Sequence, residues 1–385
     1  MEPIRILTAV PICDGHDSAI NTINLDLIRY GIEVIYLGYN RSAGDMVRAA
    51  IQEDVRAIGI SSYNGGHVEF FCEVISLLKA RGCGHIGVFG GGGATITKAD
   101  ADIMYQNGVD QIFFAGTQLE EMVRYVQSRF AVPTPSAAKD DFGDRILAAK
   151  LSEIEAGHEV DPHPFQTGAK CATKVYGISG PGGAGKTTLI DEIVLRFVQT
   201  FPPDRRLAIL SHDPSVVGSG SLLGDRATMV YSQDDQVFMR SMASRGMAGG
   251  LATASERAIK FLRELKLFDA VIIETVGTGQ EALPFGTGRS IADLSILVMP
   301  PDYGSRLQLQ KIAMLDAADI VVVNKADLVG ARTAISEIES RLRNSSGVSG
   351  TSQSVRPQTL LQTQANRHRD LGIDQIFRIL FPPNI

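Results

Sequence analysis

The hydrophobic residues between Ile4 and Arg129 fall into short apolar runs separated by amphipathic stretches. Within the stretches, apolar residues recur at helical spacing, as at Ile20, Ile23 and Leu27. Strands that alternate with helices in this way predict a parallel α/β sheet, whose ligands bind beyond the carboxyl ends of the strands. The runs that predict strands are Ile4–Ile12, Glu33–Gly38, Ala57–Ser62, His85–Gly90 and Gln111–Phe114.

The alternation stops near Ala131 and resumes near Val175. The intervening segment is polar and contains several prolines, with one predicted helix over Asp144–Glu155. We therefore expect a flavodoxin-like (Rossmann-type) α/β domain over residues 1–130, a linker over 131–173 and a second parallel α/β domain over 174–385. The strands predicted for the second domain are Lys174–Ser179, Arg206–Ser211, Ala270–Thr275, Leu294–Met299, Ile320–Asn324 and Thr359–Leu361.

Composition narrows the classes of protein to consider. The 385 residues include 37 basic and 43 acidic side chains, and this net charge of −6 argues against a nucleic-acid or membrane-surface binder, which needs a basic face. The chain has no long apolar run and no basic-then-apolar start, so we expect neither a membrane span nor secretion. The four cysteines form no CxxC pair, which makes the reducing cytoplasm the expected compartment.

The segment Gly180–Thr187 (GPGGAGKT) fits the phosphate-binding motif GxxxxGK[ST], and it follows an apolar strand and opens a helix. Backbone N–H groups and the positive helix end would bind phosphates, Lys186 would reach the β- and γ-phosphates, and the Thr187 hydroxyl would bind Mg²⁺. The alternative is a glycine-rich structural turn. The residues predicted to bind the nucleotide here are Gly180, Gly182, Gly183, Gly185, Lys186, Thr187 and Thr188.

A second motif identifies the base. Asn324, Lys325 and Asp327 form NKxD at the end of an apolar strand. An Asp carboxylate can accept hydrogen bonds from guanine N1–H and its 2-amino group, whereas adenine offers no matching pair of donors. NKxD alone could be a strand-to-helix turn. Together with the phosphate-binding motif it predicts GTP and GDP as ligands.

Two acidic residues lie between these motifs, both at predicted strand ends. Asp213 follows Arg206–Ser211, and Glu274 stands where many GTPases have the Asp of DxxG. Such carboxylates are natural ligands of Mg²⁺ and its water, so we take Lys186, Asp213 and Glu274 as the catalytic set. Thr278 follows the motif glycine in place of a water-orienting Gln, which predicts slow intrinsic hydrolysis. His212 and His368 are expected in loops near the nucleotide.

Several segments of the second half resemble a known family. The ranges Asp213–Met229, Arg240–Gly250 and Glu274–Gln280 resemble the G-protein chaperones of methylmalonyl-CoA mutase, and Pro300–Asp327 is similar to the G-domain of fused isobutyryl-CoA mutase. The resemblance implies a P-loop GTPase in which Asp213, Asp225 and Glu274 lie near Mg²⁺ with Thr187. It implies that Arg240–Gly250 is a mobile switch. It also places Ala365 of Gln364–Asn366 beside the base, where the family has an Ala-Ser-like pair.

The first domain carries a second group of candidate residues after its predicted strands. Asp14 precedes His16 by two residues, a spacing suited to a hydrogen bond that sets the tautomer of a metal-binding imidazole. Ser61 ends the third strand, and Gly90–Gly93 end the fourth, where missing side chains would admit a large planar or elongated ligand. The alternative is an exposed surface histidine in a domain with no cofactor.

This group resembles the cobalamin-binding domain of adenosylcobalamin mutases, which carries DxHxxG, SxL and GG signatures. The resemblance implies that His16 is the lower cobalt ligand and Asp14 its partner, while Ser61, Gly91 and Gly92 line the slot for the nucleotide tail. Ala19 replaces the final Gly of DxHxxG, which would cost roughly 1 kcal/mol if that position needed a positive φ. Tyr63 replaces the Leu of SxL.

A mutase of this class also needs a substrate barrel of about 250 residues, and the two α/β domains leave no segment of that length. We therefore expect an adenosylcobalamin-binding GTPase that serves an acyl-CoA mutase barrel on another chain, as a homodimer and with an adenosyltransferase as a further partner. The alternatives are the amino-terminal part of a fused isobutyryl-CoA mutase and a cobalamin-sensing regulatory GTPase. A transport kinase is a weaker alternative because nothing resembles a transporter-docking element.

Overall fold

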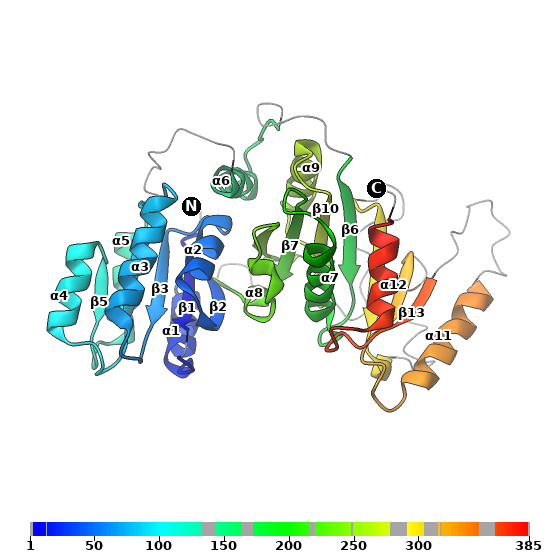
Figure 1. The fold of residues 1–385 in the computed structure, drawn as a ribbon, viewed down its shortest axis with the longest axis horizontal. Helices are drawn as coiled ribbons and strands as arrows, with labels where there is room; N and C mark the ends of the chain where they lie inside the picture. Colours follow the sequence, from blue (N-terminus) through cyan, green and yellow to red (C-terminus); the bar gives the residue numbers. More distant parts are fainter. Residues whose placement is uncertain are drawn as a thin grey trace. The chain divides into compact units, whose positions relative to one another are not determined.

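The computed structural model divides the chain into two compact units (Figure 1). Unit 1 comprises Met1–Val160, Asp213–Gln233 and Met239–Gly246, and unit 2 comprises Asp161–His212, Asp234–Phe238 and Met247–Ile385. The residues that the structure describes are 3–12, 14–132, 143–162, 172–215, 220–247, 249–277, 291–303, 315, 318–345 and 359–383.

Unit 1 is built on a six-stranded parallel sheet in the order β5-β4-β3-β1-β2-β8. The five strands predicted for the first domain are confirmed with small shifts at their ends, whereas β8 was not predicted. The strands are β1 (Arg5–Pro11), β2 (Glu33–Arg41), β3 (Ala57–Ser61), β4 (Gly87–Gly91), β5 (Gln111–Phe113) and β8 (Ser221–Leu223).

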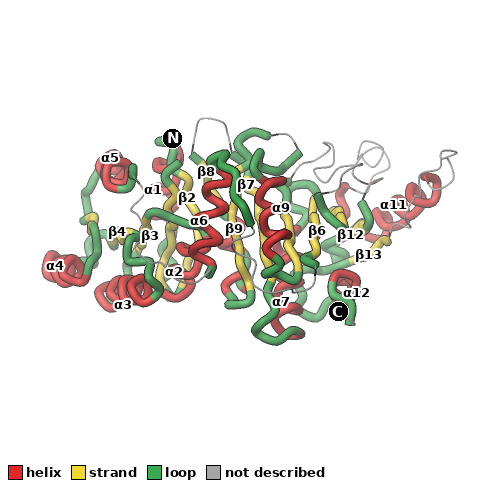
Figure 2. Tube along the Cα trace, turned by 90° about the horizontal axis from the view of Figure 1, so that it is seen from above, coloured by secondary structure: helices red, strands yellow, loops and turns green. Residues whose placement is uncertain are grey.

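Helices cover both faces of this sheet, as Figure 2 shows from above. On one face, Leu27 and Val126 pack with Phe89 and Phe113 of the strands; on the other, Phe71 and Met104 pack with Ile58. The first face carries α1 (Ser18–Arg29) and α5 (Leu119–Arg129), and the second carries α2 (Ala43–Gln52), α3 (His67–Ala80) and α4 (Lys98–Asn107).

The predicted linker helix is confirmed as α6 (Asp144–Glu155), and it belongs to unit 1. Its apolar face buries Leu147, Leu151 and Ile154, which is the pattern of a helix packed along one side. At its first turn, Gln52 Nε2 at the end of α2 donates to Asp144 Oδ2 at 2.8 Å. Helix α6 therefore packs against α2 as part of unit 1.

The second sheet has seven strands in the order β13-β12-β11-β6-β10-β7-β9. The neighbouring strands from β13 to β7 pair in parallel, and all six strands predicted for the second domain are confirmed. Strand β9 was not predicted. The strands are β6 (Lys174–Ser179), β7 (Leu207–Asp213), β9 (Val237–Ala243), β10 (Ala270–Glu274), β11 (Leu294–Met299), β12 (Ile320–Val323) and β13 (Thr359–Gln362).

The phosphate-motif helix and the final helix pack side by side in unit 2 (Figures 1 and 2). An aromatic cluster joins them, in which Phe381 lies with its ring centroid 5.3 Å from that of Phe197 and 5.1 Å from that of Phe377. The remaining helices of the described residues are α7 (Lys186–Thr200), α8 (Asp225–Thr228), α9 (Ser255–Leu265), α11 (Ala331–Ser345) and α12 (Leu371–Leu380). Of these, α8 lies in unit 1.

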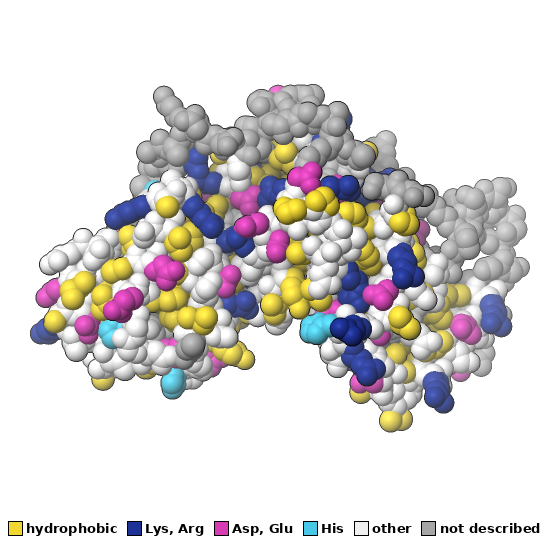
Figure 3. Space-filling view, in the orientation of Figure 1, with side chains coloured by type: hydrophobic (Ala, Val, Ile, Leu, Met, Phe, Trp, Pro, Cys, Tyr) yellow, Lys and Arg dark blue, Asp and Glu magenta, His cyan; other side chains and the backbone are white. Residues whose placement is uncertain are grey.

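The surface is mixed in charge. On the face drawn in Figure 3, basic and acidic side chains are interspersed over the described residues. Across the described part of the chain, no helix combines the length and the apolar character that crossing a membrane would require.

Candidate cofactor and nucleotide sites

The loop after β1 brings Asp14 and His16 together. Asp14 is buried, and its Oδ1 lies 2.8 Å from Nδ1 of His16 and also accepts from the His16 backbone N–H at 3.1 Å. Its Oδ2 accepts from the backbone N–H of Tyr63, which follows β3, at 2.5 Å. The His16 side chain is 70% exposed. Because Nδ1 faces the carboxylate, Nε2 is the ring nitrogen left to bind a metal.

The surroundings of Asp14 favour its ionised form. Burial alone raises the pKa of this carboxyl, but the hydrogen bonds from Tyr63 N–H and from the ring and backbone of His16 outweigh burial. The pKa of Asp14 therefore lies below its ordinary value. A carboxylate that stays charged can hold the His16 ring in one orientation and one tautomer.

A cavity of ≈ 360 Å³ opens at the carboxyl edge of the same sheet. Ser61, Tyr63 and Gly90–Gly93 line it, together with Phe113 and residues of α1 and α5. The ring of Tyr63 lies 5.6 Å from that of His16, between centroids. The predicted residues Ser61, Gly91 and Gly92 thus lie around one hollow, with His16 beside its tyrosine.

The backbone packing gives these glycines a structural reason besides the expected one. A Cβ atom on Gly90 would meet the carbonyl oxygen of Ile60, and one on Gly92 would meet that of Ser62. Gly91 is likewise limited by the carbonyl of Phe113. The close approach of neighbouring strand ends, as well as the space for a ligand, requires glycine here.

The departure at position 19 carries no backbone strain. Ala19 lies in the first turn of α1 and is not among the described residues with positive φ. The condition under which alanine would be costly here, a positive φ, is therefore not met, and helical backbone suits alanine. Ala19 also lines the ≈ 360 Å³ cavity.

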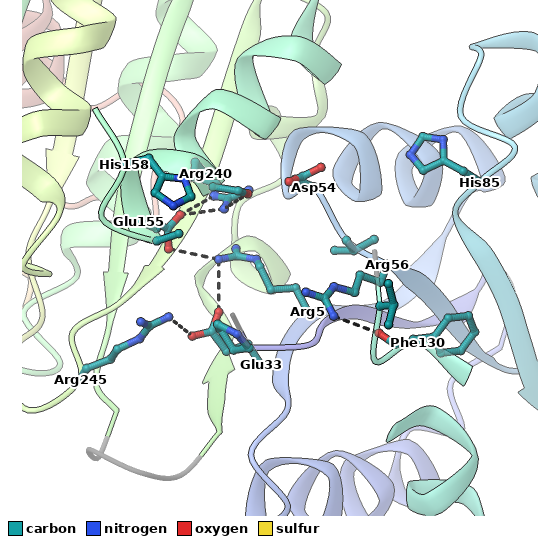
Figure 4. A pocket seen from close by; sticks show the side chains of 15 residues that line it. Arg5, Glu33, Asp54, Arg56, His85, Phe130, Glu155, His158, Arg240 and Arg245 are labelled. Carbon is teal, nitrogen blue, oxygen red and sulfur yellow. Dashed lines mark hydrogen bonds and ion pairs between the residues drawn. The ribbon is translucent and has the colours of Figure 1, made fainter. Parts of the chain in front are cut away.

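A second cavity of unit 1, of ≈ 450 Å³, lies at the opposite, amino-terminal edge of the sheet (Figure 4). Arg5 at the start of β1 pairs with Glu33 at the start of β2 (3.3 Å) and with Glu155 at the end of α6 (3.5 Å). Arg240 donates to Glu155 at 2.7 Å, and Arg245 donates to Glu33 at 2.7 Å. The guanidinium groups of Arg5, Arg240 and Arg245 are thus each paired with a carboxylate of Glu33 or Glu155.

Glu53 lies at the centre of this group and is fully buried. It accepts from Arg5 Nη2 and Arg226 Nε, each at 2.8 Å, and from the backbone N–H and hydroxyl of Ser241. Burial raises the pKa of Glu53, but the charges of Arg226, Arg5 and Arg240 outweigh it and lower the pKa overall. We call this set the charge cluster: Arg5, Glu33, Glu53, Glu155, Arg226 and Arg240.

The phosphate-binding motif of unit 2 forms a loop between β6 and α7. Gly180, Gly183 and Gly185 adopt positive φ, and a Cβ on Gly180 would meet the Val298 carbonyl oxygen. Lys186 is buried, and its Nζ donates to the carbonyl oxygens of Gly180 (3.2 Å) and Pro181 (3.3 Å). Gly182 and Thr188 are exposed. The loop has the glycine conformations that a phosphate cradle requires.

Thr187 and Glu274 meet beside this loop. Thr187 Oγ1 donates to Glu274 Oε1 at 2.6 Å, and Ser211 Oγ donates to Glu274 Oε2 at 3.4 Å. Gly277 lies so close to Gly182 that a Cβ at position 277 would lie 2.6 Å from the Gly182 backbone. The hydroxyl and carboxylate oxygens gathered here are the donors that Mg²⁺ prefers.

The other two residues expected near Mg²⁺ lie in unit 1. Asp213 Oδ2 accepts from the Gly224 backbone N–H at 3.1 Å, and Asp225 is the first residue of α8. Asp213 and Asp225 therefore lie in one segment of unit 1, Asp213–Gln233. Thr187 and Glu274 lie beside the phosphate-binding loop of unit 2. Thr278 lies outside the described residues.

A buried asparagine connects the three loops at the carboxyl edge of the second sheet. Asn324 Nδ2 donates to the Ala184 carbonyl of the phosphate loop at 2.8 Å. Its Oδ1 accepts from Thr363 Oγ1 (2.9 Å) and from the Ala365 backbone N–H (3.1 Å). Lys325 adopts a φ of +58°, and Asp327 is exposed on the same loop. The structure thus brings the predicted NKxD motif, phosphate loop and base-side loop together.

The first four residues of the expected switch Arg240–Gly250 form the buried end of strand β9, where Arg240 pairs with Glu155. The mobility expected of this range stays a prediction. One expectation about the second half is wrong: His212 is not a loop residue but lies in β7, enclosed between the Glu274 carbonyl (2.8 Å from Nδ1) and Ser255 Oγ (2.7 Å from Nε2).

The charge cluster is the part of unit 1 that sequence reasoning missed. Its members are charged residues scattered from position 5 to position 240, and hydrophobic periodicity assigns charged residues to the surface. One weak signal was available, since Arg5 and Glu33 stand at the starts of apolar runs.

Comparison with known proteins identifies both halves. Residues 165–380 match the family described as "Methylmalonyl Co-A mutase-associated GTPase MeaB", and residues 4–123 match the B12 binding domain. A methylmalonic aciduria type A homolog of Mus musculus, described as mitochondrial, is 36% identical over 204 residues, which cover 52% of this chain and 45% of that protein.

Two longer relatives match almost the whole chain. A fused isobutyryl-CoA mutase of Geobacillus kaustophilus is 35% identical over 395 residues, covering 97% of this chain and 36% of that protein. One of Cupriavidus metallidurans is 37% identical over 393 residues, covering 97% of this chain and 35% of that protein. The chain thus spans about a third of the length of these relatives.

Proposed function

Because this chain belongs to the MeaB family of methylmalonyl Co-A mutase-associated GTPases and carries a B12-binding domain ahead of its GTPase domain, we propose that it loads and protects adenosylcobalamin for an acyl-CoA mutase. The observation that carries the proposal is the pairing of buried Asp14 with exposed His16 beside a glycine-lined cavity. A GTPase on the same chain would gate that cofactor.

The residues around the cavity fit a cobalamin. His16 Nε2 would bind the cobalt, Asp14 would hold the imidazole by Nδ1, and Ser61, Gly91 and Gly92 would line the space for the nucleotide tail. When bound, adenosylcobalamin supplies radical chemistry. The aromatic and aliphatic walls of the cavity would keep water away from the cofactor.

In the GTPase unit, Lys186 would leave the carbonyls of Gly180 and Pro181 to contact the nucleotide phosphates. Thr187 and Glu274, already in hydrogen-bond contact, would hold Mg²⁺ and its water, joined by Asp213 and Asp225. Asp327 would accept from guanine, supported by Asn324, Lys325 and Ala365. These roles make the unit a GTP-hydrolysing switch.

The partner in this proposal is a substrate barrel of an isobutyryl- or methylmalonyl-CoA mutase. It stands either on a separate chain or on the same polypeptide, as the fused isobutyryl-CoA mutases that this chain resembles suggest. An adenosyltransferase would supply the cofactor, and the chain would act as a cytoplasmic homodimer. Mutase activity would then require the barrel in either arrangement.

The test is a titration of the purified chain with adenosylcobalamin, followed by its visible spectrum. We expect the spectrum of cobalamin whose own base is displaced and replaced by histidine, and we expect His16→Ala to abolish it. His158→Ala, which removes another exposed histidine of unit 1, is the matched control. An unchanged spectrum with the wild-type chain would refute the cobalamin role.

The same preparations test the GTPase role. Lys186→Ala should lower GTP turnover by about 100-fold, the scale of removing one preorganised donor to a developing charge. Lys174→Ala, an exposed lysine at the start of β6, is the control and should leave turnover unchanged. Equal turnover in the Lys186 variant and the wild type would contradict the proposed role of the loop.

A further inference from the structure

Helix α7, which begins at Lys186, carries a buried arginine further along. Arg196 is 8% exposed, and every N–H group of its guanidinium has an acceptor. Nε donates to Asp374 Oδ1 at 2.7 Å, and Nη1 donates to Oε2 (2.8 Å) and the carbonyl (3.0 Å) of Glu192. Nη2 donates to the carbonyl oxygens of His368 and Asp370, each at 3.3 Å.

The carbonyls of His368 and Asp370, which accept from Arg196, lie at the end of a loop. This loop contains the predicted base-side residues Gln364–Asn366. At the other end of this loop, Asn324 Oδ1 accepts from Thr363 and from the Ala365 N–H. In between, the Gln364 N–H donates to Asp370 Oδ2 at 3.1 Å. The loop is therefore held at one end from the NKxD motif and at the other from the phosphate-motif helix.

A buried acid completes the contact. Glu192, on the turn of α7 before Arg196, uses its second oxygen Oε1 to meet His368 Nδ1 at 2.6 Å. Its side chain is 5% exposed, so the negative charge requires the guanidinium beside it. The pair gives α7 two separate contacts with the loop.

The neighbouring helices α7 and α12 are held together by apolar contacts as well as by the Arg196–Asp374 ion pair. Helices α7 and α12 are joined by the aromatic cluster of Phe197, Phe377 and Phe381. Asp370 also caps α12 by accepting from the Ile373 N–H at 3.0 Å. Loss of the guanidinium is therefore expected to release the loop while the helices remain packed.

We propose that Arg196 is a positioning residue for guanine recognition: from the phosphate-motif helix it fixes the base-side loop Gln364–Asn366. The proposal rests on the proposed binding of GTP by this unit. It assigns Arg196 to the affinity for the base and not to the hydrolytic step, because none of its contacts involves Lys186, Thr187 or Glu274.

The experiment compares GTP with inorganic tripolyphosphate, which carries phosphates but no base, on the full chain. Arg196→Ala should raise the Kd of GTP by about tenfold, the scale of losing hydrogen bonds to a charged donor. The inhibition constant of tripolyphosphate, measured by displacement of fluorescent GTP, should change less than about twofold. Single-turnover hydrolysis of saturating GTP should also keep its rate.

Two conservative variants keep the test decisive if Arg196→Ala does not fold. Arg196→Lys retains the charge with fewer donors and should give an intermediate Kd. Asp370→Asn leaves Arg196 in place but removes one of the two acceptor oxygens that serve Gln364 and Ile373, and it should raise the Kd of GTP in the same direction.

The matched control is Arg263→Ala, which breaks the ion pair with Asp293 near the start of β6, at the edge opposite the phosphate loop. It should leave the Kd of GTP unchanged. Unchanged GTP affinity in all Arg196 and Asp370 variants, or a parallel loss of tripolyphosphate binding, would overturn the inference. Failure of the wild-type chain to bind GTP would instead refute the proposed function.

Discussion

At the scale of single residues, a few buried polar side chains determine where the candidate ligand-binding groups lie. Asp14 uses both carboxylate oxygens to fix an exposed imidazole and the loop after β3. Asn324 uses both ends of its amide to join the phosphate loop to the base-side loop. In each case a buried hydrogen-bonding group sets the geometry of loops that would contact the ligand.

We expect Asp14→Asn to weaken cobalamin binding by about 10–100-fold, the usual effect of losing the partner of a metal-binding histidine. The amide keeps the shape of the carboxylate but loses its charge, so the bond to Nδ1 of His16 weakens. Titration with adenosylcobalamin measures the change, and Asp26→Asn on α1 serves as control. An affinity equal to that of the wild type would contradict the role of Asp14.

The pH dependence follows from the same carboxylate. Because its folded pKa lies below the ordinary value, Asp14 is ionised in the folded chain from about pH 5 upward. We therefore expect the contribution of Asp14 to cobalamin binding to be constant above about pH 7.5, where protonation of an ordinary imidazole no longer competes with the metal. The Asp14→Asn variant tests this: its affinity relative to wild type should keep one ratio across that range.

Residue motifs were the most predictable part of the molecule, because their spacing follows from the ligand. The glycines of Gly180–Gly185 and the pair Asp14 and His16 could be found in this way. Arg196 and Glu53 could not, because their roles depend on partners far away in sequence, such as Asp374 and Arg226. No periodic pattern records such pairs.

At the scale of elements, apolar runs predicted the strands well wherever a run was long enough to be distinct. Strands β6 and β11 were predicted at their observed bounds. Strand β8 has three residues with an exposed Leu222, and β9 contains the charged Arg240. Neither strand therefore has the apolar pattern of a buried strand. In the fold, β8 is stabilised by pairing with β2, and the charge of Arg240 in β9 is paired with Glu155.

Removing one partner of the charge cluster should strongly destabilise unit 1. Glu53→Gln would leave buried Arg226 and Arg5 without their shared carboxylate, and we expect the free energy of unfolding to fall by about 3–5 kcal/mol. Denaturant unfolding of the full chain measures this loss. Asp26→Asn, which breaks an exposed pair with Arg29, should cost at most about 1 kcal/mol. Equal losses in the two variants would refute the prediction.

The cluster also predicts sensitivity to acid. The folded pKa values of Glu53 and Glu155 lie below their ordinary values, by the charges of Arg226, Arg5 and Arg240 acting against burial. Their stabilisation is therefore present above the unfolded pKa of about 4.3 and is lost as pH falls through the lower folded values. Unit 1 should keep its stability down to about pH 5 and unfold in stronger acid, which melting curves across pH would show.

At the scale of the whole molecule, two proposed ligand sites lie on one chain, and the chain passes repeatedly between the two units. The segment after Asp213, which carries Asp225 of the proposed magnesium set, also carries Arg226 of the charge cluster. A change at the nucleotide site therefore has a covalent route to the cofactor-binding unit.

If GTP gates the cofactor, the two affinities must be linked. We expect a non-hydrolysable GTP analogue to change the Kd of adenosylcobalamin by about 5–150-fold, and adenosylcobalamin to change the Kd of the analogue by the same factor. Paired titrations measure both factors. Lys186→Ala should remove the linkage while leaving cobalamin affinity without nucleotide unchanged. If neither ligand changes the Kd of the other, gating within this chain is contradicted.

The sixth strand of unit 1 has a consequence for how such proteins can be divided in evolution. Because β8 pairs with β2, and Arg226 with Glu53, the cofactor domain is completed by residues encoded after the phosphate-binding motif. A gene split at the linker would expose the unpaired backbone of β2, which favours aggregation, and would leave buried Glu53 with Arg5 but without Arg226. In this chain the two halves are therefore expected to fold only as one piece.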